Sequence, residues 1–156
     1  MAESLPLAEK FRRLGAPNPE AWARSQEQEG IPQLARFFFL QQAWERVVPR
    51  GDIEWIDGEL GHAPDIPGGA ISPALRRLLD IGADKQDITT VVRTMQWQLL
   101  FRLCYLLDGP GYWEDFMSDM NWRLFQIDEE GNPIVPIEGL HESVLETEPS
   151  GTEMIG

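Results

Sequence analysis

The longest apolar pattern in the chain lies in residues 87–108, DITTVVRTMQWQLLFRLCYLLD. Apolar residues recur there at steps of three and four, which is the spacing of one helix face. The residues on that face are Ile88, Val92, Met95, Leu99, Leu103 and Leu106. Further apolar residues lie on most other sides, which is typical of a helix surrounded by partners. We therefore predict a central helix that begins at a cap, Asp87, and ends at Asp108-Gly109-Pro110-Gly111.

The residues before this helix predict four shorter helices and one long loop. Each helix follows a start signal, which is a capping residue or a proline in the first helical position. The predicted ranges are 5–14 after Ser4, 19–22 after Asn18, 32–48 from Pro32, and 74–81 after Ser72 and Pro73. Residues 50–71 hold five of the 14 glycines and two of the 12 prolines, so we predict a loop there. Loops of this length in compact domains are usually functional or mobile.

The residues after Asp108 change from helical to alternating spacing. A short amphipathic helix is expected in residues 112–120. Two β-prone runs, 122–127 and 134–137, then flank the sequence DEEGNP, which is typical of a hairpin turn. Because an isolated two-stranded ribbon is only marginally stable in water, the hairpin should pack on the helices. Apolar residues from Leu140 to Leu145 predict one further helical turn.

These elements predict the fold class and the domain organisation. We expect a mainly α fold, a helical bundle around one long central helix with a small C-terminal β-hairpin. The alternative is an α+β fold, if the hairpin gains a third strand. The 156 residues suit a single globular domain over 1–156, with 146–156 as an exposed and frayed acidic tail. The single cysteine, Cys104, excludes an internal disulfide and should be inert packing in the most apolar helix.

The negative charge of the chain is concentrated in its last third. The formal net charge is −13, and residues 108–156 carry 12 acids against one base, Arg123. An acidic field repels nucleic acid and anionic lipid, and it accelerates the encounter with basic proteins. The N-terminal residues do not follow a signal-peptide pattern, and no apolar run approaches the length of a membrane span. We therefore expect a cytoplasmic protein that binds neither nucleic acid nor membrane.

Residues 57–65, DGELGHAPD, hold a cluster of carboxylates and an imidazole. The carboxylates could supply oxygen ligands to a divalent cation, and the histidine could act as a ligand or a base. The candidate residues are Asp57, Glu59, His62 and Asp65. Their spacing matches neither an EF-hand nor a helical zinc-protease motif, so no metal or other cofactor is predicted. An enzyme or metal-dependent domain that uses this loop, with His141 as a further base, is the alternative function.

Aromatic residues beside acids in the last third predict a protein-binding surface. The candidate contact residues are Trp113, Glu114, Asp115, Asp119, Trp122, Asp128, Glu129 and Glu130. Packing of the hairpin on the helices competes as an explanation of the two tryptophans. We favour a non-enzymatic binding protein that is steered to a basic protein partner and buries an aromatic anchor against it.

Two further expectations concern the kind of inhibitor that this chain resembles in composition and its self-association. Small acidic inhibitors of toxic enzymes, such as bacterial immunity proteins, share the composition of this chain and nothing more specific. Self-association is also open, because helix-rich domains often form homodimers through a shared apolar face.

Overall fold

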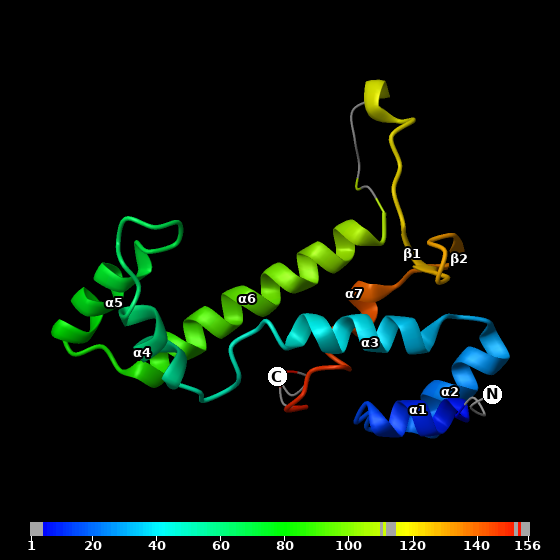
Figure 1. The fold of residues 1–156 in the computed structure, drawn as a ribbon, viewed down its shortest axis with the longest axis horizontal. Coiled ribbons are helices and arrows are strands. Elements are labelled where there is room, and N and C mark those ends of the chain that lie inside the picture. Colours follow the sequence, from blue (N-terminus) through cyan, green and yellow to red (C-terminus); the bar gives the residue numbers. More distant parts are fainter. Residues whose placement is uncertain (1–4, 110, 112–114, 152, 154–156) are drawn as a thin grey trace. The chain divides into compact units, whose positions relative to one another are not determined.

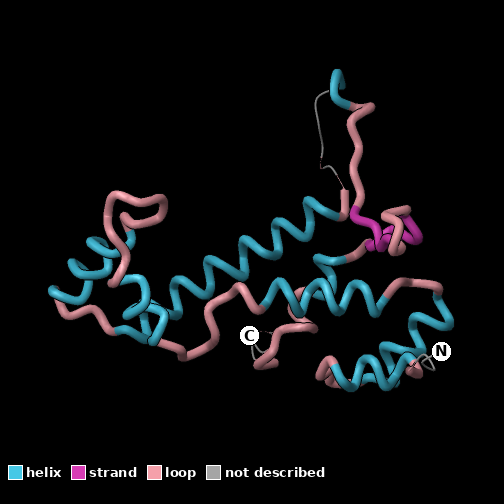
Figure 2. Tube along the Cα trace, viewed as in Figure 1, coloured by secondary structure: helices cyan, strands magenta, loops and turns pink. Residues whose placement is uncertain are grey.

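The computed structural model describes residues 5–109, 111, 115–151 and 153. Within these residues the chain forms seven α-helices, one short 3₁₀ helix and a two-stranded antiparallel sheet (Figures 1 and 2). The predicted fold class is confirmed, because the fold is mainly α with a β-hairpin near the C-terminus. None of the helices described has both the length and the apolar character needed to cross a membrane.

The chain divides into two compact units. The first unit combines Met1–Trp44 with Leu100–Gly156, and the second unit is Glu45–Leu99. The second unit is therefore one continuous stretch that lies, in sequence, between the two parts of the first. The expectation of a single domain over 1–156 stays a prediction.

Three helices open the first unit: α1 (Leu7–Arg13), α2 (Pro19–Glu29) and α3 (Gln33–Trp44). Their core includes an aromatic cluster in which Phe11 stacks on Trp22 at 6.0 Å between ring centroids, and Phe37 meets both rings edge-on. The predicted cap of α2 is confirmed, because the side chain of its N-cap residue accepts a hydrogen bond from the backbone of Ala21 at 3.3 Å. The helix continues to Glu29, seven residues beyond its predicted end at 22.

The C-terminal part of the first unit holds the 3₁₀ helix η1 (Asp115–Met117), strands β1 (Leu124–Ile127) and β2 (Pro133–Ile137), and helix α7 (Leu140–Ser143). Side chains of α3 connect this part to the N-terminal helices. The indole N–H of Trp44 donates to the carbonyl of Val144 at 2.8 Å, and the guanidinium of Arg36 donates to the carbonyl of Glu138 at 2.8 Å.

Two expectations for the C-terminal part differ from the structure. A single 3₁₀ turn stands at 115–117 in place of the helix predicted over 112–120, of which residues 112–114 lie outside the described residues. Residues 146–156 were expected to be exposed, but Thr147 and Glu148 are buried. Thr147 is held by its hydroxyl, which donates to the carbonyl of Ser143 at 3.0 Å.

The second unit contains α4 (Glu54–Leu60), α5 (Ile71–Asp80) and the first part of α6 (Lys85–Leu107). Its core is Ile56, Leu75 and Ile88, one residue from each helix. The prediction of a loop over residues 50–71 is wrong for α4. The glycine content suggested a loop, but Ile56 is fully buried, and burial of that apolar side chain outweighs the low helix propensity of Gly58.

Helix α6 occupies the predicted range but not the predicted environment. Val91, Met95 and Leu99 are 63%, 62% and 56% exposed, so the elements of the second unit do not surround its part of the helix as predicted. Apolar periodicity reports which side chains are apolar, and it does not report how many neighbours are available to cover them. Asp87 does not cap the helix; the carboxylate of Asp84 accepts from the backbone N–H of Gln86 at 2.6 Å instead.

Candidate protein-binding surface

Strands β1 and β2 form a hairpin whose turn is held by hydrogen bonds to an aspartate within it. Leu124 pairs with Ile137 and Phe125 pairs with Pro136, and the register shifts between Gln126 and Ile127. In the turn, the carboxylate of Asp128 accepts hydrogen bonds from the backbone and side-chain N–H groups of Asn132 at 2.7 and 3.0 Å. The chain reverses through Gly131, whose φ of +89° favours glycine.

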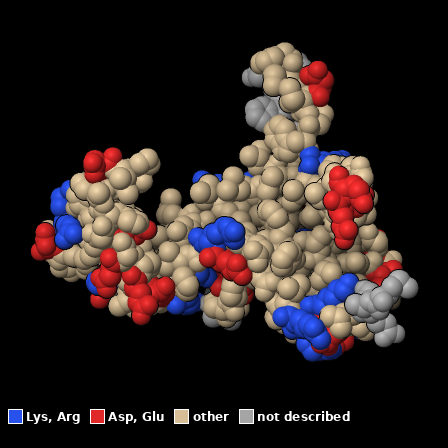
Figure 3. All heavy atoms as spheres, in the orientation of Figure 1, with Lys and Arg blue, Asp and Glu red and all other residues tan. Residues whose placement is uncertain are grey.

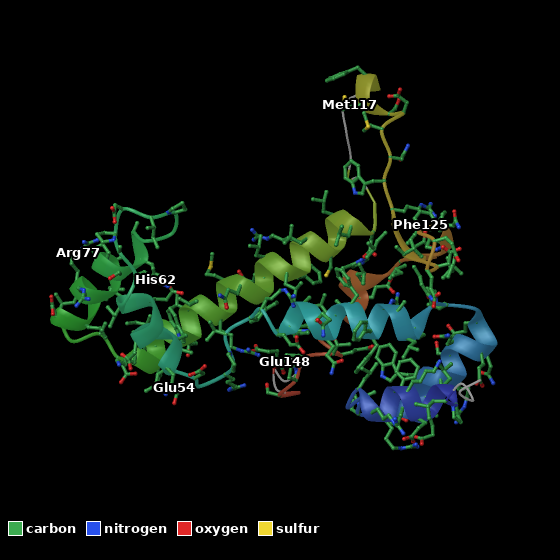
Figure 4. All side chains as sticks on the ribbon, in the orientation of Figure 1. Glu54, His62, Arg77, Met117, Phe125 and Glu148 are labelled. Carbon is green, nitrogen blue, oxygen red and sulfur yellow. The ribbon has the colours of Figure 1, made fainter. Side chains whose placement is uncertain are left out.

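The two faces of the hairpin differ in exposure. Ile137 is buried, with 6% of its surface exposed, and it anchors the inner face. On β1, Phe125 and Ile127 alternate with Gln126 and are 41% and 58% exposed, and Ile134 on β2 is 58% exposed. We call these three residues the apolar face of the hairpin. Figure 4 shows Phe125 on this hairpin.

Acidic side chains border the apolar face at the turn. The turn carries Asp128, Glu129 and Glu130, and Figure 3 shows acidic atoms gathered over the hairpin. Hydrogen bonds from Asn132 lower the pKa of Asp128 below its ordinary value, because they favour the charged form of the carboxylate. Among the described residues, Glu129 and Glu130 are exposed and form no ion pair, whereas Arg123 is engaged by Glu138 at 2.5 Å.

The other predicted contact residues have different surroundings. Trp113 and Glu114 lie outside the described residues, and Asp115 begins η1 with its side chain also outside them. Asp119 is exposed in the turn that follows η1. Trp122 is only partly exposed, and its indole N–H donates to the carbonyl of Leu106 at 2.7 Å. The polar edge of this ring therefore serves packing inside the first unit.

The acids of this surface were predicted from the sequence, whereas its apolar residues were not. Phe125, Ile127 and Ile134 were assigned to the hairpin, which was expected to pack on the helices, and no exposed face was predicted for it. One available signal is that β1 places apolar residues at consecutive positions, so that both of its faces cannot be covered by a single layer of helices. Phe116 was missed in the same way and is 79% exposed.

The structure does not bring the carboxylates of residues 57–65 together. Asp57 and Glu59 lie on α4, where Asp57 pairs with the amine of Lys85 at 2.8 Å. Glu59 contacts His62 Nδ1 at 2.9 Å, one helical turn away, and Asp65 is exposed. Across the described residues, no three histidine, cysteine, aspartate or glutamate side chains come together as metal ligands.

His141 is engaged at the end of α6. Its Nδ1 hydrogen-bonds to the carboxylate of Asp108, and its ring meets that of Tyr105 at 4.8 Å. Two potential nucleophiles in the first unit are buried: Ser143 is 3% exposed, and burial raises the pKa of the Cys104 thiol to about 12. The Asp108 and His141 pair therefore has a clear structural use, which is to connect α6 to α7.

No protein-family model matches this chain, and neither does any curated protein or solved structure. Its class is therefore stated from geometry: a mainly helical protein that presents a β-hairpin with an apolar face and an acidic turn.

Proposed function

We propose that this chain is a non-enzymatic, cytoplasmic binding protein whose acidic C-terminal third engages a basic protein partner, as an inhibitor or immunity-type protein does. The observation that carries the proposal is the hairpin, where Phe125 and Ile127 are exposed beside the carboxylates of Glu129 and Glu130. An apolar centre with a charged rim is the ordinary composition of a protein interface.

The apolar face would supply most of the affinity. Full burial of a large apolar side chain contributes about 1.5–3 kcal/mol, and roughly half of that is available from side chains that are about half exposed. Phe125, Ile127 and Ile134 are such side chains. Flat two-stranded ribbons gain stability when a further layer covers them, so a partner would also stabilise the hairpin.

The acidic turn would act mainly on the rate of association. Residues 108–156 carry 12 acids and one base, so their field attracts a basic surface and repels nucleic acid. Exposed charges at an interface rim are screened by salt and change the association rate more than the final affinity. We therefore expect binding that is fast at low ionic strength and slower as salt is added.

The experiment compares two charge reversals of equal size. The partner is captured from a native lysate at low salt on the immobilised chain, eluted with a salt gradient and identified. Association of that partner is then measured with the wild type, with Glu129→Lys/Glu130→Lys, and with Glu27→Lys/Glu29→Lys on the exposed end of α2. Asp128 is retained in all variants because its hydrogen bonds to Asn132 hold the turn.

We expect the hairpin reversal to lower the association rate constant about tenfold at low salt and to flatten its salt dependence. The α2 reversal should change both much less. Phe125→Ala should mainly raise the dissociation rate, by about tenfold, because it removes an anchor rather than a charge. Equal effects of the two reversals would show that only net charge matters, and the hairpin would not be the contact.

A further inference from the structure

We infer that the first unit also carries a groove that binds residues 115–120 of a second copy of this chain, so that two copies exchange these segments. The groove lies between α1 and α3 beside β1, with a volume of about 630 Å³. Apolar side chains from the two helices line it. They include Leu7, Leu14, Leu34 and Phe38.

The groove is open, and the described residues that line it include two basic side chains and no acidic one. Phe38 on its wall is 50% exposed, and Leu5 is 37% exposed. The charged residues among those that line it, Lys10 and Arg13, are both basic. The guanidinium of Arg13 forms an ion pair with the carboxylate of Glu9 at 3.2 Å. Lys10 forms no ion pair with the described residues. An apolar groove with a basic rim suits an apolar segment that also carries an acid.

Residues 115–120 have that chemistry. Phe116 is 79% exposed and Met120 is 53% exposed, so the structure leaves two large apolar side chains of this segment uncovered. Asp119 lies between them in sequence and is exposed. The apolar and acidic groups of the segment therefore complement the apolar wall and the lysine of the groove.

A second copy is the occupant that the described contacts favour. Phe116 is largely exposed, and the segment that carries it does not line the groove of its own chain. A second copy supplies the same segment, and its own groove can receive the first copy's segment in return. This reciprocal arrangement is the isologous contact of a two-fold dimer, in which the groove and segment of one copy meet the segment and groove of the other.

The dimer contact is separate from the apolar face of the hairpin. Gln126 lines the groove, and its neighbour Phe125 points to the opposite face of β1 because side chains alternate along a strand. Ile127 and Ile134 are not among the described residues that line the groove. A segment seated in the groove therefore leaves the apolar face of the hairpin accessible. Failure of one proposal does not imply failure of the other.

The test is a charge exchange, read as molar mass by sedimentation and light scattering of the full chain from about 1 µM to about 1 mM. We expect the wild type to dimerise within this range. Lys10→Glu places two acids together in each contact, and Asp119→Lys places two bases together, so each single variant should associate at least about tenfold more weakly. An equimolar mixture of the two, and the double variant, should both regain dimerisation.

Three further samples complete the design. Phe116→Ala should weaken dimerisation about tenfold, because it removes the apolar anchor. Arg77→Glu on α5 matches the charge change of Lys10→Glu outside the groove, and Glu129→Lys/Glu130→Lys reverses the hairpin turn; both should dimerise as the wild type does. A wild type that stays monomeric throughout, or single variants that the mixture does not rescue, would overturn the inference. Unfolding curves of each variant identify any that fails to fold. If one of the two charge variants does not fold, the inference is tested by the loss of dimerisation in Phe116→Ala.

Discussion

Arg36 is a buried cation on α3, and its guanidinium leaves no room for a side chain at position 139. Its side chain is 9% exposed, and the guanidinium donates to the carbonyl of Glu138 and to Gln33 Oε1 at 3.2 Å. Gly139 has a φ of +68°, and a Cβ at this position would overlap Arg36 Nη2. The two donated hydrogen bonds hold the guanidinium in place, so it cannot move aside at low cost.

Gly139→Ala should therefore cost more stability than backbone strain alone. We expect a loss of about 2–3 kcal/mol, the sum of about 1 kcal/mol for a left-handed alanine and the displacement of a hydrogen-bonded guanidinium. Gly30→Ala is the matched control, because Gly30 has a φ of +71° and no atom within 4 Å of its added Cβ. Urea unfolding measures both. Equal losses of stability at the two positions would mean that the Arg36 side chain moves aside at little cost.

Cys104 gives a prediction on pH. Burial, and secondarily the charge of Asp108, raises the pKa of its thiol from 9.0 to about 12. A raised pKa in the folded state means that the thiol stabilises the fold below about pH 9 and loses that contribution as the pH rises toward 12. We expect the stability difference between wild type and Cys104→Ala to shrink above pH 9. A thiol reagent at pH 8 should label the native chain far more slowly than the denatured chain; equal rates would contradict the burial.

At the scale of elements, one carboxylate connects the end of α6 to the start of α7. Asp108 accepts hydrogen bonds from the backbone N–H groups of Leu140 at 2.9 Å and His141 at 3.1 Å, and from the His141 ring. From the sequence, this residue was interpreted only as part of a helix stop. Its second role could not be predicted, because its partners lie more than 30 residues further along the chain.

Asp108→Ala should destabilise the first unit by about 2–3 kcal/mol, because it leaves two partly buried N–H groups without their charged acceptor. Asp108→Asn should cost less, since its amide oxygen can still accept one of these bonds. Thermal and urea unfolding provide the measurement, and His141→Ala separates the ring contact from the backbone contacts. If Asp108→Asn were as damaging as Asp108→Ala, the charge rather than the acceptor geometry would be essential.

Local signals predicted some elements well and others poorly. The cap at Asn18 and the hairpin turn at Asp128 depend on residues within four positions of each other, and both were predicted correctly. Helix α4 was missed because its stability comes from Ile56 meeting side chains of α5 and α6, which local composition does not report. Ser72 was predicted to cap α5, but it lies inside the helix and donates to the carbonyl of Leu60 at 3.1 Å.

For the candidate surface, the acids could be predicted and the apolar face could not. Residues 128–130 follow a hairpin-turn pattern in the sequence, and turn residues usually lie at the surface, so their exposure could be expected. The exposure of Phe125 and Ile127 depends on how much of the hairpin the helices cover, and that is settled by contacts distant in sequence. An apolar strand without a covering layer has the same sequence pattern as one with a layer.

At the scale of the whole molecule, the two units should respond separately to core mutations. Ile56→Ala removes a fully buried side chain from the second unit, and Leu40→Ala does the same in the first, each at about 2–5 kcal/mol. We expect hydrogen exchange to accelerate mainly over 45–99 in the first variant and over 1–44 and 100–156 in the second. Equal acceleration everywhere would instead establish the single cooperative domain that chain length predicts.

The order in which the first unit is assembled has a consequence for its synthesis. Trp44 donates a hydrogen bond to a carbonyl 100 residues later in the chain, and Arg36 donates to one 102 residues later. A ribosome that has released α3 must therefore translate the whole of the second unit before those donors can meet their native acceptors. During that interval the emerging N-terminal helices lack the C-terminal part of the first unit, and the side chains that pack against it stay in contact with water.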